Sequence, residues 1–371
     1  MPLVPPYIES LEPYVPGKHA AELQKEFGLT RIIKLASNEN PFGPSPIAIK
    51  ELQQYYTELN IYPNGGLELR QILAERFHLK LGNVVAGSGS EGIMSNIIRA
   101  FLCDEDEVLT SEGTFIGFYV LARSRGTRLV TVPLKNYHFD LQAIADRITE
   151  HTKIIYLANP NNPTGTIFTK AEFDRFWRRV PDHVLIILDE AYFEYARTNR
   201  DYPDSMNYRY DNVITLRTFS KAYGLAGIRI GYGFAHDQLI GNLLKVKLPF
   251  EPSTLAQAAG IGALSDTEFL HKTLEANEAG KKFLGEGLMT FGLSHIPTEA
   301  NFFCVPFEDE EAALGLYNAL LRQGIIVRPL RAFCLPNCLR ITIGTPEQNE
   351  FLLERLRLCL QQTVGKNPAN Q

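Results

Sequence analysis

The sequence lacks the features of secreted, membrane-spanning and nucleic-acid-binding proteins. Its 371 residues include five cysteines, an odd number that does not favour a disulfide framework and that fits a reducing compartment. No apolar run approaches the roughly 18 residues of a membrane-spanning helix. The formal net charge is -5, so there is no surplus of basic residues for nucleic acid. We therefore expect a cytoplasmic protein that binds neither a membrane nor nucleic acid.

Two further absences concern local motifs. The N-terminal stretch MPLVPPYIESLEPYVPGK has no basic segment followed by an apolar one, so we expect no signal peptide. Cys334 and Cys338 lie close together in AFCLPNCLR, but no second pair and no nearby histidine accompanies them. Two small apolar side chains are therefore a better interpretation than a metal site, and we expect no metal.

What the sequence does contain is the composition of a large globular protein. Hydrophobic residues make up 45% and charged residues 21%, which excludes a disordered chain. At this length, two domains that share a core are expected. We predict a proline-rich N-terminal arm over residues 1–45, a large domain over residues 46–255 and a smaller domain over residues 256–371.

From about residue 65, short apolar runs alternate with helical patterns. The runs NVVAG, DEVLTSE, TRLVTVPL, TKIIYLANP, HVLIILDEAY and NVITLRTFS have cores rich in valine, isoleucine and leucine. Several are apolar throughout, which is typical of strands that are covered on both faces. Segments such as KAEFDRFWRRV carry a helical pattern between them. This order predicts an α/β fold with a mainly parallel sheet covered by helices.

After about residue 250 the pattern becomes that of a smaller α+β domain. A long helical stretch that starts at TLAQAAG leads to NFFCVPF, to a helix around AALGLYNALLRQ, and to the strands GIIVRPL and CLRITIG. The last helix begins at a clear capping signal. Thr345 can cap it, Pro346 suits the first helical position, and Gln348 completes a capping box.

Unusual polar residues follow four of the predicted strands. They are Gly87-Ser88-Gly89-Ser90, the stretch NPNNPTG over residues 159–165, Asp189-Glu-Ala-Tyr192 and Ser220-Lys221. Open α/β sheets bind their ligands at the carboxyl ends of the strands. We therefore expect these four groups to lie together around one ligand.

Taken singly, each group has an ordinary structural interpretation. The Gly-Ser turn before a helix is either an anion cradle or a simple turn, and simple turns are commoner. Asp189 is either a loop cap or the counter-ion of a buried cation. Lys221 either reaches solvent or, once desolvated, acts as a nucleophile. Arg229 is either an exposed residue or a fork that binds an anion.

One ligand would use all of these groups at once. It needs a phosphate for the Gly-Ser turn, Ser220 and Arg229, and a protonated ring nitrogen for Asp189. It also needs a phenolic oxygen for Asn162 and an aldehyde for Lys221. Pyridoxal 5′-phosphate carries all four of these groups, so the sequence favours a site for this cofactor.

The chain resembles the fold-type I, class I/II aminotransferases over nearly its whole length. The stretches NPNNPTG, DEAYFEY and RTFSKAYGLAGIRIGY follow one another in the order that is typical of that family. Within the family, KLASNENPFGPSP, GIIVRP and LRITIG are most similar to the group that acts on histidinol phosphate. The resemblance implies a homodimer in which the N-terminal arm packs on the small domain and on the partner subunit.

The resemblance also implies a role for each matching residue. Lys221 would bond to the cofactor aldehyde and later carry a proton between substrate and cofactor. Asp189 would keep the ring nitrogen protonated, and Tyr192 would bind the phenolic oxygen; these three are the expected catalytic residues. The residues expected to hold the cofactor are Ser88, Gly89, Ser90, Phe115, Asn162, Asp189, Tyr192, Ser220, Lys221 and Arg229, with Tyr62 reaching across from the other subunit.

The implied reaction is amino-group transfer between L-histidinol phosphate and 2-oxoglutarate, a step of histidine biosynthesis. Arg328 and Arg340 resemble the pair that binds the acidic end of the substrate, and two guanidinium groups suit a phosphate. Tyr14, Asn38 and Asn162 are the other residues that we expect to contact the substrate.

Two positions depart from the pattern of the family. Ser90 stands where an aspartate is common, and Gly113-Thr114-Phe115 stands where Pro-Thr-Tyr is common, although Phe115 can still stack on a ring. Aromatic amino-acid aminotransferases and related enzymes of phospho-amino acids share most of the motifs, so they remain alternatives. A regulator that senses the cofactor would need a DNA-binding module, and the arm has no helix-turn-helix pattern.

Overall fold

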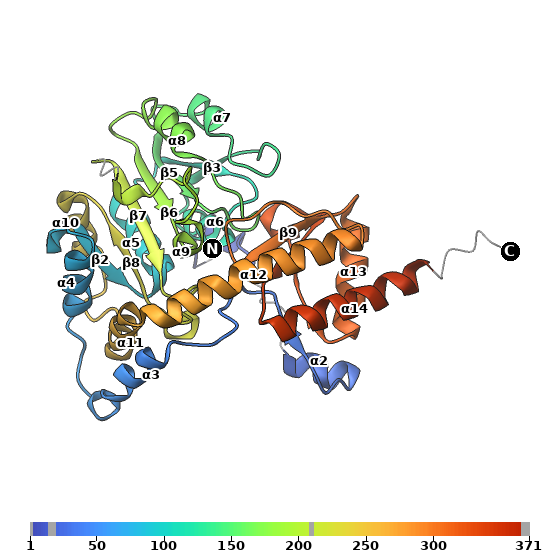
Figure 1. Ribbon diagram of the computed structural model, residues 1–371. Helices are drawn as coiled ribbons and strands as arrows, with labels where there is room; N and C mark the ends of the chain where they lie inside the picture. The colour runs from blue at the N-terminus through green and yellow to red at the C-terminus, as the bar shows by residue number, and fades with distance from the viewer. Residues whose placement is uncertain (1–2, 14–19, 208–210, 365–371) are drawn as a thin grey trace.

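The protein consists of two groups of elements joined by one long helix. The computed structural model describes residues 3–13, 20–207 and 211–364, and every element named below lies in these ranges. One group surrounds a seven-stranded sheet and the other a three-stranded sheet. Figure 1 shows α12 (Thr267–Thr290) running from the first group to the second.

The seven-stranded sheet is mainly parallel and has the order β2-β8-β7-β6-β5-β3-β4. Its strands β7, β6, β5, β3 and β4 are parallel neighbours, whereas β8 runs antiparallel to both β2 and β7. The bounds are β2 (Val84–Gly87), β3 (Glu107–Ser111), β4 (Arg128–Val132), β5 (Thr152–Ala158), β6 (Leu185–Asp189), β7 (Val213–Thr218) and β8 (Gly231–Phe234). The predicted α/β fold with a mainly parallel sheet is confirmed.

Helices cover both faces of this sheet. Successive residues of a strand point to opposite faces, and here the side chains on both faces are apolar. Val85 of β2 belongs to a core with α5, α6, α7, α8 and α10, whereas its neighbours Val84 and Ala86 belong to a core with α3, α4 and α11. The helix bounds are α3 (Pro46–Gln53), α4 (Leu67–Arg76), α5 (Gly89–Phe101), α6 (Ile116–Ser124), α7 (Leu141–Asp146), α8 (Lys170–Trp177), α9 (Phe193–Ala196), α10 (Asp237–Val246) and α11 (Thr254–Ser265).

The second group is built on antiparallel strands in the order β11-β12-β9, namely β11 (Arg328–Pro329), β12 (Cys338–Thr342) and β9 (Phe302–Pro306). A separate parallel pair joins β1 (Ile33–Lys34) to β10 (Ile325–Ile326), so the N-terminal segment is tied to this group. The helices are α2 (Ala20–Phe27), α13 (Glu310–Arg322) and α14 (Pro346–Val364), while the short α1 (Pro6–Glu9) lies against α6.

The start of α14 has the predicted capping box. The backbone N–H of Gln348 donates to the Thr345 hydroxyl at 3.2 Å, and the backbone N–H of Thr345 donates to the Gln348 side chain at 3.0 Å. The long helical stretch after residue 250, in contrast, is two helices. Asp266 separates them, because its carboxylate accepts the Phe269 N–H at 3.1 Å and so caps α12. Of these, α11 packs mainly on α3.

Strand β8 is an element that the sequence patterns did not reveal. Its sequence, GYGF, alternates glycine with aromatic residues, and glycine is depleted in strands. The structure gives a reason for Gly231: a Cβ atom there would lie 2.4 Å from the backbone nitrogen of Ser90. The missing side chain therefore lets β8 lie directly against the Gly-Ser turn.

None of the helices within the described ranges combines the length and the apolar character that a membrane-spanning segment requires.

Candidate active site

The carboxyl ends of β5, β6 and β7 surround a cavity of about 150 Å³. Ala158 of β5 pairs with Asp189 of β6, which in turn pairs with Leu216 of β7, so the three strand ends lie side by side. The cavity is lined by Ser90, Glu91, Phe115, Ala158, Pro160, Asn162, Asp189, Ala191, Tyr192, Thr218, Ser220, Lys221, Ala226 and Arg229. The structure thus brings together polar groups from all four of the strand ends that the sequence singled out.

A second cavity of about 480 Å³ adjoins the first and shares five of its wall residues, Glu91, Phe115, Asn162, Tyr192 and Lys221. Its remaining wall comes largely from the N-terminal segment, from α6 and from the three-stranded sheet; the polar residues added are Lys34, Ser37, Asn38, Arg328 and Arg340. The two cavities together form one site, which has an inner part over the large sheet and an outer part between the two groups of elements.

An anion cradle forms the floor of the inner part. Gly89 has φ +78°, and a Cβ atom on it would lie 2.7 Å from Nη2 of Arg229, so glycine permits the close approach of the guanidinium. Nη1 of Arg229 lies 3.5 Å from the Ser220 hydroxyl. Ser90 belongs to the first turn of α5, whose N-terminus favours negative charge. Ser88 points elsewhere, because its hydroxyl donates to Glu251 at 3.0 Å and it does not line the cavity.

Asp189 is a buried carboxylate at the end of β6. Its oxygens accept hydrogen bonds from the Tyr156 hydroxyl at 2.7 Å and from the backbone N–H of Ala191 at 3.2 Å. Burial raises the pKa of Asp189 to about 6, although the hydrogen bond from Tyr156 opposes that change. A cation brought to this carboxylate would therefore relieve an unfavourable charge.

Tyr192 is held in place by the N-terminal segment. Its hydroxyl accepts a hydrogen bond from the side-chain amide of Asn38 at 2.8 Å. Asn38 itself is fixed by Thr342 of β12, whose hydroxyl donates to its amide oxygen at 2.9 Å and accepts its backbone N–H at 3.0 Å. Burial raises the pKa of the Tyr192 hydroxyl to about 12, so this group stays protonated at neutral pH.

Lys221 reaches into both cavities from the loop after β7. Its amine donates to the backbone oxygen of Ser37 at 3.2 Å and lies 5.8 Å from the centre of the Tyr192 ring. Burial, and then the positive charge of Arg340, lower the pKa of Lys221 to about 8. A larger fraction of this amine is therefore neutral at physiological pH than of an exposed lysine, which favours nucleophilic and basic chemistry.

Two arginines from the small sheet face the outer cavity. Arg328 of β11 and Arg340 of β12 are directly paired across antiparallel strands, and both line the cavity wall. Arg340 is buried, donates to the backbone oxygen of Ala36 at 2.7 Å, and forms a short hydrogen bond to the side-chain oxygen of Asn162. These contacts orient one guanidinium toward the ligand space next to Lys221.

Three of the predicted site residues within the described ranges, Ser88, Gly89 and Tyr62, are not in the wall of either cavity. Tyr62 is 76% exposed and stacks on Phe250 with ring centres 4.1 Å apart. Neither cavity includes it in its wall. Tyr14 lies outside the described residues.

The structure also adds residues that the sequence motifs did not single out. Tyr156 contacts Asp189 because β5 and β6 are neighbours, and the only sign of it was a tyrosine within the apolar run KIIYLA. Glu91 follows the Gly-Ser turn and lines both cavities, and Lys34 lines the outer one. In the sequence, Glu91 and Lys34 are charged residues next to or within recognised motifs, and a charged residue by itself predicts only exposure to solvent.

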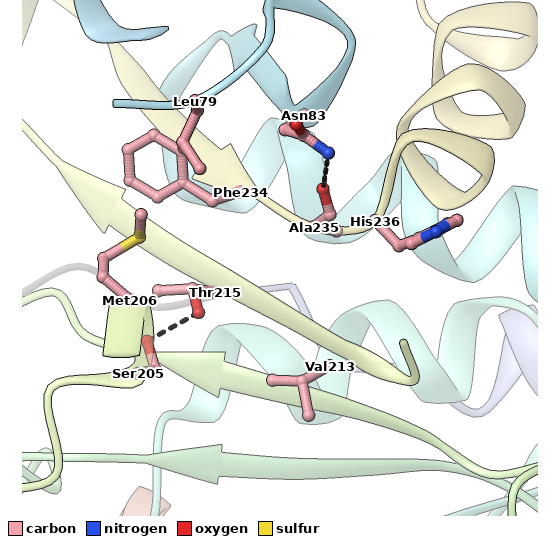
Figure 2. Close-up of a pocket in the computed structure, with 9 residues that line it drawn as sticks. All are labelled: Leu79, Asn83, Ser205, Met206, Val213, Thr215, Phe234, Ala235 and His236. Carbon is pink, nitrogen blue, oxygen red and sulfur yellow. Dashed lines mark hydrogen bonds between the residues drawn. The ribbon is translucent and has the colours of Figure 1, made fainter. Parts of the chain in front are cut away.

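A further cavity, of about 200 Å³, lies away from these strand ends (Figure 2). Its polar groups pair with one another or with the nearby backbone. The hydroxyls of Ser205 and Thr215 are 2.6 Å apart, and the Asn83 amide donates to the backbone oxygen of Ala235 at 3.0 Å. His236 accepts the backbone N–H of Gln238 as the cap of α10. This wall offers no converging set of charged groups.

The mainly parallel sheet covered by helices is a fold of the kind found in aminotransferases. The two cavities, with an aspartate and a lysine at the ends of neighbouring strands, are a site of the same kind. The model of the aminotransferase class I and II family matches residues 30–356, and the chain belongs to that family.

Relatives within the family are similar over almost the entire chain. The histidinol-phosphate aminotransferase 2 of Pseudomonas fluorescens is 42% identical over 96% of this chain and 97% of its own length. The histidinol-phosphate aminotransferase 2 of Carboxydothermus hydrogenoformans is 39% identical over 95% and 98%. The crystal structure of histidinol-phosphate aminotransferase from Sinorhizobium meliloti in complex with pyridoxal-5′-phosphate has a TM-score of 0.88 and 29% identity, over 98% of this chain and 99% of that one.

Proposed function

We propose that the chain is a histidinol-phosphate aminotransferase that depends on pyridoxal 5′-phosphate. It would transfer an amino group between L-histidinol phosphate and 2-oxoglutarate, with imidazole-acetol phosphate and L-glutamate as the other partners of the reaction, in histidine biosynthesis. The observation that carries this proposal is that paired Arg328 and Arg340 line the same cavity as Lys221. The similarity to histidinol-phosphate aminotransferases along the chain supports the choice of substrate.

The residues of the inner cavity fit the proposed cofactor. Gly89 leaves room for the Arg229 guanidinium, which with Ser90 and Ser220 suits a phosphate. The carboxylate of Asp189 suits a cationic ring nitrogen, and Phe115 supplies an aromatic face in the cavity wall. Pyridoxal 5′-phosphate, when bound, supplies an aldehyde that bonds to amines and a ring that accepts the electron pair released at the substrate α-carbon.

Lys221 is the proposed base and acid of the reaction. Its lowered pKa, about 8, increases the fraction of neutral amine at neutral pH, and this amine would hold the cofactor through its aldehyde. In the reaction, the amine of Lys221 would take the proton from the substrate α-carbon as a base and later give a proton back as an acid. A group whose pKa lies close to the working pH is suited to both halves of this task.

Asp189, Tyr192 and Asn162 are proposed to set the electronic state of the cofactor ring. Tyr156 and the Ala191 N–H hold the Asp189 carboxylate in position, so that it can keep a ring nitrogen protonated. The Asn162 side-chain oxygen already faces Arg340, which leaves the amide N–H groups of Asn162 as its donors toward a phenolic oxygen. The high pKa of Tyr192 makes it a second donor there.

Substrate binding is proposed to rest on the outer cavity. Arg340 and Arg328 would bind the phosphate of histidinol phosphate, and Arg340 would bind a carboxylate of glutamate in the same place. Asn38 shapes this cavity through its contacts with Tyr192 and Thr342. Tyr14, in the N-terminal arm, is also proposed to contact the phosphate of the substrate.

We also propose that the enzyme acts as a homodimer. An apolar surface around the stacked Tyr62 and Phe250 supports this, since Leu59, Ile61 and Leu248 beside them in the chain are also more than half exposed. The segment that follows Phe250 contacts the Gly-Ser turn, because Glu251 accepts a hydrogen bond from Ser88. Tyr62 would reach the cofactor phosphate of the other subunit.

A substrate panel tests the proposed function. Purified enzyme loaded with cofactor is assayed on histidinol phosphate, phenylalanine, tyrosine and threonine phosphate, with 2-oxoglutarate as acceptor. The expected result is the highest kcat/KM on histidinol phosphate. A higher kcat/KM on phenylalanine would instead make the protein an aromatic amino-acid aminotransferase. Borohydride reduction and peptide mapping address the cofactor separately, and the label is expected on Lys221.

A further inference from the structure

The outer cavity contains one carboxylate among several cations. Of the described residues in its wall, Lys34, Lys221, Arg328 and Arg340 carry positive charge, and Glu91 carries the negative charge. Glu91 lies in the first turn of α5 and lines the inner cavity as well. A wall that is otherwise cationic suits the phosphate of a substrate, so the position of this one acid needs its own explanation.

The Glu91 carboxylate lies beside the aromatic ring of Phe115. A Cβ atom on Gly117 would be 2.9 Å from Oε1 of Glu91 and 2.5 Å from the ring of Phe115. The absence of a side chain at residue 117 therefore makes room for the acid and the ring together. Because the Glu91 side chain is 48% exposed, its oxygens remain accessible to a ligand that enters the cavity.

The contacts of Glu91 do not make it a cofactor-binding group. Its ion pair among the described residues is with Arg229, at 3.7 Å between side chains that are both about half exposed, and such a pair contributes little. A carboxylate next to an anion cradle also repels a phosphate there. These contacts give Glu91 no favourable role toward an anionic cofactor, and its place in the walls of both cavities leaves its oxygens available on the substrate side.

We propose that Glu91 selects the imidazole ring of the substrate, an inference that rests on the proposed function. Histidinol phosphate has an acidic end and a basic end. While the arginines hold the phosphate, the Glu91 carboxylate accepts a hydrogen bond from an imidazole N–H, and pairs with the ring when the ring is protonated. A phenyl ring has no N–H, so it would cover the carboxylate without satisfying it. Glu91 thereby favours imidazole substrates over aromatic amino acids.

The test compares the two half-reactions of the same enzyme in single-turnover experiments. Glu91→Gln keeps the size of the side chain and removes its charge. It is expected to lower kcat/KM for histidinol phosphate by about 10- to 100-fold, the range for losing a hydrogen bond to a charged group. The half-reaction with glutamate, which has no imidazole, is expected to be unchanged or faster. The affinity for pyridoxal phosphate, measured by titration of the apoprotein, is expected to be unchanged or tighter.

Two further variants control the experiment. Glu91→Asp keeps the charge on a shorter side chain and is expected to lose less activity on histidinol phosphate than Glu91→Gln. Glu278→Gln removes an exposed carboxylate of the same type, which pairs with Lys281 on α12 outside both cavities, and is expected to match the wild type.

Three results would overturn the inference. The first is an equal loss on histidinol phosphate and glutamate, the second is weaker binding of pyridoxal phosphate by Glu91→Gln, and the third is no loss on histidinol phosphate. Failure of the proposed function is a different result, because the wild-type enzyme itself would then not turn over histidinol phosphate.

Discussion

The cavity at the ends of β5, β6 and β7 and the cavity of Figure 2 lie on the same sheet but differ in what their polar groups contact. In the cavity of Figure 2, the hydroxyls of Ser205 and Thr215 bond to each other, so this pair needs no ligand to complete its hydrogen bonds. In the first, Asp189 and Lys221 have opposite charges and each has a pKa displaced by burial. The difference indicates that oppositely charged groups buried around one hollow, rather than the hollow alone, mark the candidate site of chemistry.

The largest effect on activity is expected when the amine of Lys221 is removed from the inner cavity. Lys221→Ala should lower kcat by about a thousandfold or more, because it removes the acid–base group of the transfer. Steady-state kinetics on histidinol phosphate measure the loss. Lys245→Ala, on the exposed face of α10, serves as the matched control and should retain full activity. An active Lys221→Ala enzyme would contradict the assignment of the chemistry to the inner cavity rather than to the cavity of Figure 2.

A smaller loss is expected at the substrate end of the same site. Arg340→Lys keeps the charge but loses the planar fork, so KM for histidinol phosphate should rise about 10- to 100-fold. The control is Arg331→Lys, since Arg331 is an exposed residue of the same group and is paired with Glu310. If the two variants have the same KM, charge alone is sufficient at position 340.

A third variant tests the role of the raised pKa of Asp189. Tyr156→Phe removes a hydrogen bond that lowers the pKa of Asp189, so this pKa should rise further above about 6. Because a cationic ring nitrogen pairs with the ionised carboxylate, the pH below which pyridoxal phosphate binding weakens should move upward. Titrations of the apoprotein between pH 5 and pH 8, about the range in which such a group titrates, measure the shift. A change in affinity without a shift of the midpoint would mean a purely structural role.

The smallest effect on activity is expected in the cavity of Figure 2. Ser205→Ala leaves the Thr215 hydroxyl without its present partner and should lower the free energy of unfolding by about 1–2 kcal/mol. Adding Thr215→Val removes both hydroxyls and should recover part of that loss. Thermal unfolding measures both changes, and kcat/KM should stay at the wild-type value. A drop in kcat/KM for either variant would contradict the contrast between the cavities.

Much of this site was predictable because parallel strands end at one edge of a sheet. Asp189 and Lys221 are 32 positions apart in the sequence, yet Asp189 ends the apolar run of β6 and Lys221 follows the end of β7 by three residues, so the strand pattern predicted that they would lie together. The paired Arg328 and Arg340, in contrast, were expected from resemblance rather than from strand positions. Their contact depends on the register of two antiparallel strands, and no pattern in the sequence specified it.

Other features could not be predicted because they depend on close packing between distant segments. Tyr156 reaches Asp189 only through the pairing of β5 with β6. Strand β8 was missed because Gly231 and Gly233, which weaken a strand by composition, are required there by the Ser90 turn and by Leu216. Ser88 was expected at the cofactor phosphate, but its side chain is engaged by Glu251, a contact between segments that are far apart in the sequence.

The contacts of Arg340 have a consequence for any measurement of anion affinity. Its guanidinium is bonded to Ala36 of the N-terminal segment and to Asn162 of the loop after β5, while its backbone belongs to β12. These two oxygens use only part of the five N–H groups of the guanidinium, so they fix its orientation toward an incoming anion. An apparent dissociation constant therefore depends on how firmly the guanidinium is held, and variants at residue 162 should raise it by loosening one of the two contacts.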